Sequence, residues 1–342
     1  SEAEVIEAFA PLAVKIAADA ERLPETITYK ESNQAAVELD RLSVSEYLER
    51  IGARGWIRSL LEVAYVTEYG LEAGEQSALN LITLIGTDTG GGFEVFGESD
   101  ERYKIKGGNA RLVDALLVDA GGQEGVLKGE MSGIRGASQT LAWKDGGQET
   151  GQFLITVPFP AMRHMELDAL SQQKQKVVHE LGYGTNAKLI MGVNRRVWRG
   201  AGKCGTVFTD AGFQCAWDSS RGQPGELGSL TIYTGGKLGA KTPSGSPQSE
   251  RDAILDVLDK ALPGVKAAAN DRVVRAHWPS VPTARASYSC YKPGQWTTLR
   301  GLEAEPDGCA FFAGEHCSAD WQGYMNGAVE SGIAAARAMV GR

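Results

Sequence analysis

Apolar residues recur at helical spacing through the first third of the chain. The first set falls on one face of a single helix: Val5, Phe9, Leu12 and Ile16. Ser43 followed by Glu46 has the spacing of a capping box, which predicts that a second helix begins near residue 44. Two further helices are expected at 56–69 and 76–85, each followed by glycine. The chain therefore opens with a helical region.

From residue 103 onward the pattern changes to short extended segments separated by glycine. The expected strands are 103–106, 126–128, 139–143, 152–157, 187–193, one around 207, 230–233 and 309–313. An Asp145-Gly146 turn between two of them predicts a β-hairpin. Helices are expected at 111–117, 171–181, 250–262 and 321–339, and a loop rich in Gly, Pro and Ser at 235–249.

Two glycine-containing segments indicate close approach to the backbone. Gly107 and Gly108 stand between an expected strand and an expected helix, where they bring helix N–H groups near a ligand or simply make a turn. Along the last helix, small residues recur at spacings of three and four: Gly323, Gly327, Ala328, Ser331 and Ala335. Because interior glycines cost helix stability, something must lie very close to this face, either a ligand or another element.

Composition and charge narrow the class of protein. The net charge of −8 argues against a nucleic-acid groove, which needs clustered Lys and Arg. None of the five cysteines forms a C-x-x-C unit and the four histidines lack metal-ligand spacing, so we expect no metal site. The first residues are acidic, where a secretion signal needs a basic start and an apolar run, and a cytoplasmic location is favoured.

Five segments in register resemble the flavin-containing amine oxidase family, which includes monoamine, L-amino-acid and polyamine oxidases. They are Gly107-Gly108-Asn109-Ala110-Arg111-Leu112, Tyr183-Gly184-Thr185-Asn186-Ala187-Lys188, His277-Trp278, Ala286-Ser287-Tyr288-Ser289, and the stretch from Phe311 to Gly332. A single glycine motif would be weak, but these five span nearly the whole chain.

The resemblance implies a set of residues that bind FAD. The glycine-rich segment contributes Gly107, Gly108, Asn109 and Arg111, and the C-terminal signature contributes Gly314, Glu315, Gly323, Tyr324 and Met325. Glu315 corresponds to an acidic residue beside the ribityl chain, and the helix N-terminus near Met325 points at the flavin pyrimidine ring, whose reduced form carries negative charge. Glu315 as a surface carboxylate remains the alternative.

Further residues correspond to positions around the reacting atoms. Lys188 matches the lysine that holds a water against flavin N5, Tyr288 and Tyr324 match two rings of an aromatic cage, and Trp278 matches a tryptophan near the isoalloxazine. The alternatives are a strand-edge lysine and ordinary aromatic packing. Ser287 occupies the position where some relatives carry a cysteine bonded to the flavin, so the resemblance implies noncovalent FAD.

The implied reaction is oxidation of an amine or L-amino acid by hydride transfer to flavin N5. The imine product hydrolyses to a carbonyl compound and ammonia, and molecular oxygen becomes hydrogen peroxide. Two alternatives stay open: a related flavoprotein desaturase or isomerase, and a noncatalytic subunit or truncated relative that needs a partner chain for FAD. The implied partners are thus a small amine or amino acid and oxygen, and a homo-oligomer is left open.

The resemblance begins after the family's opening strand, G-x-G-x-x-G turn and helix, which receive the pyrophosphate. We therefore expect an N-terminal FAD-binding fragment or partner chain to supply that segment. The implied fold is mixed α/β, with an FAD-binding domain interleaved with a substrate domain. Its expected parts are a helical substrate part at 1–100, an FAD-binding part at 101–176, a substrate sheet at 177–280 and a second FAD-binding part at 281–342.

Overall fold

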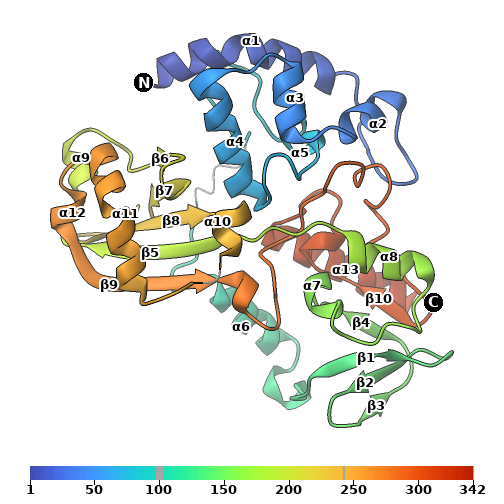
Figure 1. Cartoon of the computed structure of the whole chain (residues 1–342). Coiled ribbons are helices and arrows are strands. Elements are labelled where there is room, and N and C mark those ends of the chain that lie inside the picture. Colours follow the sequence, from blue (N-terminus) through green and yellow to red (C-terminus); the bar gives the residue numbers. More distant parts are fainter. Residues whose placement is uncertain (98–102, 242, 342) are drawn as a thin grey trace.

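The computed structural model describes residues 1–97, 103–241 and 243–341 (Figure 1). The elements follow one another as α1 (Glu2–Ala20), α2 (Gln34–Asp40), α3 (Val44–Arg50), α4 (Gly55–Tyr69), α5 (Ala78–Ile82), α6 (Ala110–Asp119), β1 (Met131–Arg135), β2 (Thr140–Trp143), β3 (Gln148–Glu149), β4 (Phe153–Ile155), α7 (Phe159–Met162), α8 (Gln172–Glu180), β5 (Ala187–Val193), α9 (Val197–Gly200), β6 (Val207–Phe208), β7 (Cys215–Asp218), β8 (Gly228–Thr234), α10 (Gly236–Ala240), α11 (Pro247–Ala261), α12 (Val265–Ala268), β9 (Ala269–His277), β10 (Ala310–Phe312) and α13 (Met325–Val340). The mixed α/β fold expected from the sequence is confirmed.

Helices α1 to α5 form a layer at one end of the molecule (Figure 1). Helix α1 buries Phe9, Leu12 and Ile16, which lie on the apolar face predicted from their spacing. The predicted capping box begins α3, because the Glu46 N–H donates to Ser43 Oγ at 3.2 Å and the Ser43 N–H donates to Glu46 Oε2 at 2.8 Å. Two N–H groups that the helix cannot pair internally are thereby satisfied.

An antiparallel five-stranded sheet, ordered β6-β7-β8-β5-β9, forms the centre of a second layer. Strand β5 has the bounds that the sequence predicts, and its residues alternate between the two faces. Leu189, Met191 and Val193 are buried in a core shared with α11, which covers that face (Figure 1). Lys188 and Ile190 therefore project from the opposite face.

The remaining strands form two small sheets. Strand β10 pairs in parallel with β4, with Phe311 opposite Leu154, and all three residues of β10 are buried. A hairpin forms at the predicted Asp-Gly turn, where the Trp143 N–H donates to the Gly147 carbonyl at 2.9 Å, but its second strand is β3. The strand expected at 152–157 is β4, which pairs with β10 and not with β2. Helix α13 follows β10 and packs against it.

Several elements differ from the sequence-based expectation. Residues 103–106 and 126–128 are not strands: Tyr103 is 89% exposed, and the first strand begins only at Met131. Both segments lie on the surface, where their peptide groups can bond to water, and a strand is not stable by itself. Helix α13 begins at Met325, four residues later than expected, because Gly323 has a φ of 84° that no continuous helix accepts.

Strands β7 and β9 were not expected. Strand β9 is nine residues long, yet none of these residues is fully buried, so its sequence lacks the alternation that marks a half-buried strand. The expected helix at 76–85 is shortened to α5. The segment expected as a loop at 235–249 holds α10 and the first turn of α11, apart from residue 242, which lies outside the described residues.

Two hydrophobic cores organise the described chain. The larger core joins the N-terminal helices to β4, β10, α7 and α8, and the smaller core lies between the five-stranded sheet and α11 and α12. The division into parts at 1–100, 101–176, 177–280 and 281–342 stays a prediction. Its first boundary, between residues 100 and 101, lies outside the described residues.

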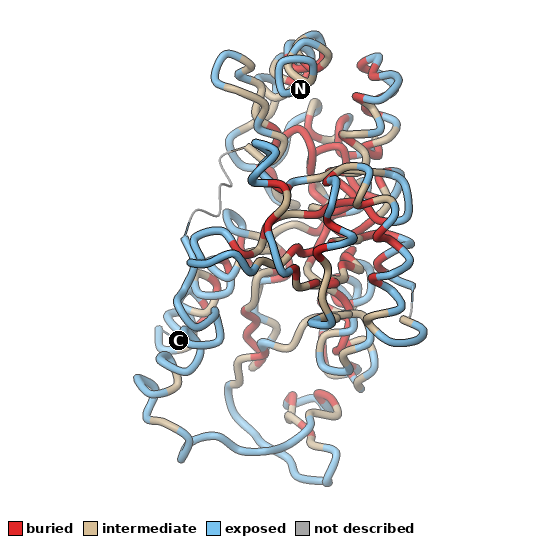
Figure 2. The backbone as a smooth tube through the Cα atoms, turned by 90° about the vertical axis from the view of Figure 1, so that its left-hand side faces the viewer, coloured by how far each residue is buried: buried red, intermediate tan, exposed pale blue. Residues whose placement is uncertain are grey.

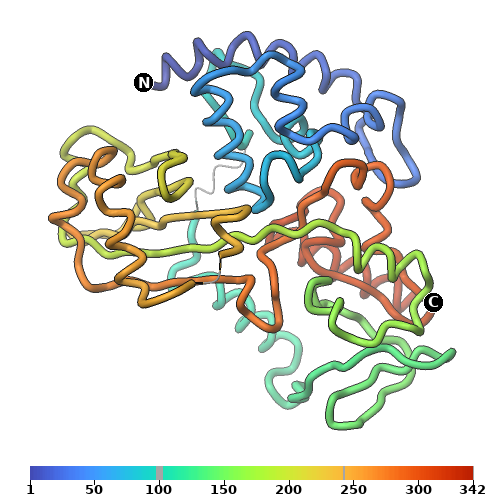
Figure 3. Tube along the Cα trace, in the orientation of Figure 1, coloured from blue at the N-terminus to red at the C-terminus, as the bar shows by residue number. Residues whose placement is uncertain are grey.

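Segments from the two ends of the chain lie side by side, as the blue and red traces in Figure 3 show. The Tyr29 N–H donates to the Arg300 carbonyl at 3.0 Å. Asp40, which is fully buried, accepts hydrogen bonds from the Thr297 N–H at 2.9 Å, from its hydroxyl at 2.8 Å and from the Ser77 hydroxyl at 2.7 Å. The C-terminal part is therefore built onto the N-terminal helices.

Helix α6 and one side of α13 are open to solvent. None of the ten residues of α6, all of which the structure describes, is buried. Buried residues gather in the interior, and the chain near the C-terminus is largely exposed (Figure 2). Apolar side chains on the two helices are between 36% and 88% exposed: Leu112, Val113, Leu116 and Val118 on α6, and Met325, Val329, Ile333 and Val340 on α13.

Candidate functional site

The glycine-rich segment before α6 meets the start of α13. Gly107 and Gly108 adopt φ values of 93° and 94°, which side-chain-bearing residues rarely adopt, and they turn the chain into the helix. The amide Nδ2 of Asn109 then lies 3.4 Å from Sδ of Met325, although the two residues are 216 positions apart. The Cδ atom of Arg111 packs 2.7 Å from where a Cβ on Gly107 would be, so that glycine cannot be replaced without movement.

Glu315 joins three segments at the end of β10. Its carboxylate accepts hydrogen bonds from the Ser289 N–H at 3.0 Å, the Ser289 hydroxyl at 2.7 Å and the Gly323 N–H at 2.9 Å. Burial raises the pKa of this carboxyl, while the three donors act in the opposite direction. Gly314, with a φ of 146°, precedes it and exchanges hydrogen bonds with the Ser331 hydroxyl. Glu315 is thus an interior linking group, and its alternative as a surface carboxylate does not apply.

Tyr288 and Tyr324 both lie next to Gly323. A Cβ on Gly323 would lie 3.8 Å from Cδ2 of Tyr288, and Tyr324 is the N-cap residue of α13. The Tyr288 hydroxyl donates to the Glu68 carbonyl and lies 3.0 Å from the Tyr233 hydroxyl. Burial raises the pKa of Tyr288 well above its usual value, so its ring remains a neutral phenol.

Lys188 lies among aromatic rings of the five-stranded sheet. It pairs across the sheet with Tyr233 of β8, and its Nζ is 5.1 Å from the centre of that ring and 5.7 Å from the centre of the Trp217 ring. Aromatic faces attract a cation at this range. Because Tyr233 also touches Tyr288, the structure connects Lys188 to one of the two predicted cage residues.

Trp278 is not drawn into this group. It begins a 3₁₀ turn, Trp278–Ser280, directly after β9 and is 43% exposed. The preceding residue, His277, has its two ring nitrogens 2.7 Å from the Ser280 hydroxyl and 3.0 Å from the Gly239 carbonyl. The role of Trp278 beside a flavin stays a prediction.

Sequence reasoning missed several residues of this region. Tyr233 and Trp217 surround Lys188, but their strands had to be placed in register before that could be known. Ser289 lies inside a segment that carried the resemblance, although only the structure shows that it holds Glu315. Gln322, whose side chain is buried in the same region, has no feature in the sequence that would single it out.

The start of α13 can accept the flavin that the sequence motifs predict. Nε2 of Gln322 is buried and, among the described residues, has no hydrogen-bond partner. Such a donor usually has a bound partner in the functional state. The N-cap residue Tyr324 makes no side-chain capping bond, so its side chain does not satisfy the first N–H groups of α13, where the positive end of the helix lies. These donors suit a ring system that gains negative charge on reduction.

The described residues hold no group of three or more His, Cys, Asp or Glu side chains able to bind a metal ion. Among the helices that the structure describes, none has the length and apolar character needed to cross a membrane.

Comparisons with known proteins place these features in context. Residues 10–340 match the family model described as flavin containing amine oxidoreductase. The chain is 26% identical over 310 residues to the nicotine dehydrogenase of Pseudomonas putida (strain DSM 28022 / S16), covering 89% of this chain and 61% of that relative. It is also 26% identical over 274 residues to the flavin-dependent L-tryptophan oxidase RebO of Lentzea aerocolonigenes, covering 72% of this chain and 54% of that relative.

Among solved structures, putrescine oxidase bound to putrescine superposes with a TM-score of 0.82 at 17% identity, covering all of this chain and 77% of that one. This likeness concerns the fold. The chain spans less than two thirds of the length of the two curated relatives.

Proposed function

The chain belongs to the flavin-containing amine oxidoreductase family, and from this we propose that it forms the substrate-oxidising part of an FAD-dependent enzyme. The substrate would be a small amine or an L-amino acid. The observation that carries the proposal is the meeting of the glycine-rich segment and the start of α13 at Asn109 and Met325, beside the Glu315 network. Residues from two distant motifs are thereby brought together.

A bound flavin supplies a two-electron acceptor for the hydride that leaves the carbon next to the amine nitrogen, and the resulting imine takes up water to give a carbonyl compound and ammonia. The chain's own residues bind and orient the reactants. Tyr288, held by the Glu68 carbonyl and by Tyr233, is a fixed neutral ring against which an amine can lie. We assign the second ring of the cage to Tyr324.

Lys188 is proposed to hold a water near the reacting flavin atom. Its ammonium already lies near the rings of Trp217 and Tyr233, so a further contact with a water molecule requires little rearrangement. Ser287 is engaged with Asn186, since its hydroxyl donates to Oδ1 at 2.6 Å and accepts from the Asn186 N–H at 3.2 Å. A serine cannot form a thioether, so we propose noncovalent FAD.

The identity of the electron acceptor belongs to the same proposal. We propose molecular oxygen, with hydrogen peroxide as its product, and the L-tryptophan oxidase supports this choice. The nicotine dehydrogenase is named for the other class of acceptor. The two are separated by measuring turnover with oxygen and with an artificial electron acceptor under anaerobic conditions.

We further propose that polypeptide outside residues 1–342 supplies the adenosine half of the FAD site. The apolar residues exposed on α6 and α13 support this, because soluble proteins rarely leave contiguous apolar surfaces uncovered. Strand β10 also supports this, because among the described strands it pairs only with β4, along one edge. A parallel strand placed on its other edge would complete the sheet.

The test is an absorbance spectrum of the protein purified from its native source, with a denaturing gel and intact mass. Flavin bands together with additional polypeptide are expected, followed by peroxide release when amines and L-amino acids are added. A colourless protein of a single 36.5 kDa chain would overturn the proposal. Flavin without turnover on any amine, but with desaturation of a hydrophobic substrate, would favour the desaturase alternative.

A further inference from the structure

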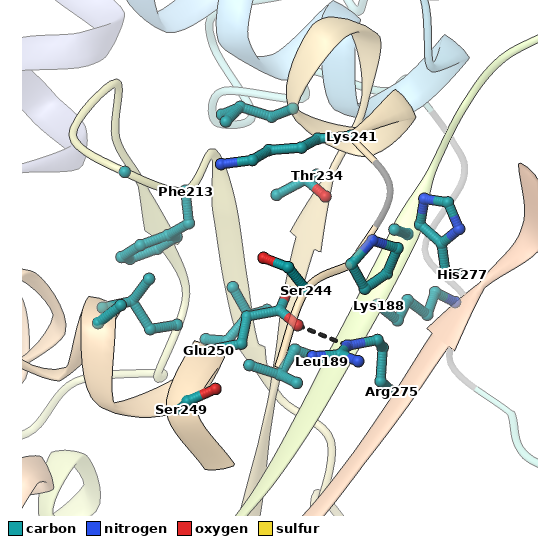
Figure 4. A pocket seen from close by; sticks show the side chains of 17 residues that line it. Lys188, Leu189, Phe213, Thr234, Lys241, Ser244, Ser249, Glu250, Arg275 and His277 are labelled. Carbon is teal, nitrogen blue, oxygen red and sulfur yellow. Dashed lines mark hydrogen bonds and ion pairs between the residues drawn. The ribbon is translucent and has the colours of Figure 1, made fainter. Parts of the chain in front are cut away.

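A cavity lies against the five-stranded sheet, on the side covered by α11 (Figure 4). Its volume is about 330 Å³, within the range of small-molecule pockets. Strands β5, β8 and β9 form its floor, α11 forms one wall, and α10 with residues 243–244 forms the rim (Figure 4). Lys188 also lines the cavity, although its Nζ lies 5.1 Å from the centre of the Tyr233 ring, so the cavity borders the site described above.

The floor and wall of the cavity are apolar. Leu189, Ile232 and Phe213 are at most 4% exposed, and Ile254 of α11 is 8% exposed. Ala253 is the neighbouring residue on the same helix and presents only a methyl group to the space. A ligand here would therefore need an apolar body.

The polar part of the lining includes three cationic side chains, Lys188, Lys241 and Arg275. Arg275 donates to Glu250 at 2.6 Å and to the Gly245 carbonyl at 3.3 and 3.4 Å, so these two opposite charges compensate one another. Lys241 has no ion pair among the described residues. The hydroxyls of Thr234 and Ser244 lie around the same space as Lys241 (Figure 4).

We propose that this cavity binds a small carboxylate. Its apolar body lies on Leu189, Ile232 and Ile254, and its two carboxylate oxygens accept hydrogen bonds from Lys241 and from the hydroxyls of Thr234 and Ser244. The Lys241 ammonium carries the charge opposite to that of a carboxylate and would repel an amine. The inference is independent of flavin binding and of amine oxidation.

The test is calorimetric titration of the purified full chain, with any polypeptide that copurifies, using hexanoate as the probe. A Kd of about 1 mM or below is expected for a ligand of this size. Hexylamine, which has the same body and the opposite charge, should bind at least about tenfold more weakly. Lys241→Met should weaken hexanoate by about tenfold, as expected for a lost hydrogen bond to a charged group.

Two further variants separate this cavity from other sites. Ala253→Phe fills the space from the α11 wall and should abolish hexanoate binding, and Lys260→Met on the same helix, which does not line the cavity, should leave it unchanged. Circular dichroism verifies that each variant is folded. The proposal is wrong if hexanoate does not bind, if hexylamine binds as tightly, or if both Lys241→Met and Ala253→Phe bind hexanoate like the wild type.

Discussion

Two buried side chains, Lys174 and Glu303, have shifted pKa values that their neighbours in sequence do not explain. Lys174 donates to the carbonyls of Leu302 at 2.5 Å and Glu303 at 3.0 Å, and burial lowers its pKa to about 8. Glu303 is 1% exposed and accepts from the Tyr291 hydroxyl at 3.0 Å, and burial raises its pKa to about 7. These contacts join residues far apart in the chain, so they could not be predicted from sequence.

Glu303 gives stability a defined pH dependence. The native protein holds this proton up to about pH 7, whereas the unfolded chain releases it near 4.5, so stability falls as pH rises through that window. The free energy of unfolding is lower by about 3 kcal/mol at the upper end of this pH window than at its lower end. Glu303→Gln should remove this part of the pH dependence of the free energy of unfolding, which urea unfolding at several pH values measures. Glu180→Gln, at an exposed carboxyl, is the control and should keep the slope; an unchanged slope in Glu303→Gln would contradict the assignment.

Lys188 tests the proposed chemistry. Lys188→Met keeps much of the apolar stem between Tyr233 and Trp217 but removes the ammonium. We expect flavin reduction or reoxidation to slow by about a hundredfold, the lower range for a lost proton-handling group. Stopped-flow absorbance of the assembled enzyme measures both steps. Lys176→Met, on the surface of α8, should leave them unaltered, and equal rates in the two variants would remove Lys188 from the mechanism.

At the scale of elements, sequence signals worked where they were local. The capping box of α3, the Asp-Gly turn after β2 and the apolar strand β5 all depend on residues a few positions apart, and all three are found. The signals failed where tertiary contacts decide: β9 is a strand because β5 lies beside it. The candidate site follows the same rule, since its motifs could be recognised but their contact at Asn109 and Met325 could not.

The small residues of α13 turn out to have unequal roles. A Cβ on Gly327 would lie 2.2 Å from the Trp321 carbonyl, so Gly327→Ala must displace the turn that leads into the helix. Gly332 has nothing within 4 Å of its Cβ position. We expect Gly327→Ala to lower the melting temperature and weaken flavin retention. Gly332→Ala should stabilise the protein by up to about 1 kcal/mol through helix propensity. Equal effects of the two substitutions in calorimetry and flavin release would show that the close approach is unimportant.

At the scale of the whole molecule, the exposed surface of α6 and α13 governs solubility and assembly. Leu116 and Val329 are 50% and 43% exposed, so replacing both with Glu should change the free energy of unfolding by less than about 1 kcal/mol. Self-association of the isolated chain should decrease, and FAD retention in the complete enzyme should fall. Light scattering and flavin absorbance measure these effects. Val14→Glu, at a site 72% exposed on α1, should alter neither; if the double variant behaves like it, the surface has no partner.

The pairing of the chain's two ends also has a consequence for synthesis on the ribosome. Thr297 must reach Asp40 across 257 positions, and Trp296 must reach Asn80 across 216. The N-terminal helices therefore leave the exit tunnel long before Trp296 and Thr297 are synthesised, although these residues bond the buried polar groups of Asn80 and Asp40. Contacts of such long range slow folding, and a hydrophobic core that is still partly exposed is prone to aggregate. Nascent chains stalled before residue 296 should bind chaperones, and release should follow only when translation is nearly finished.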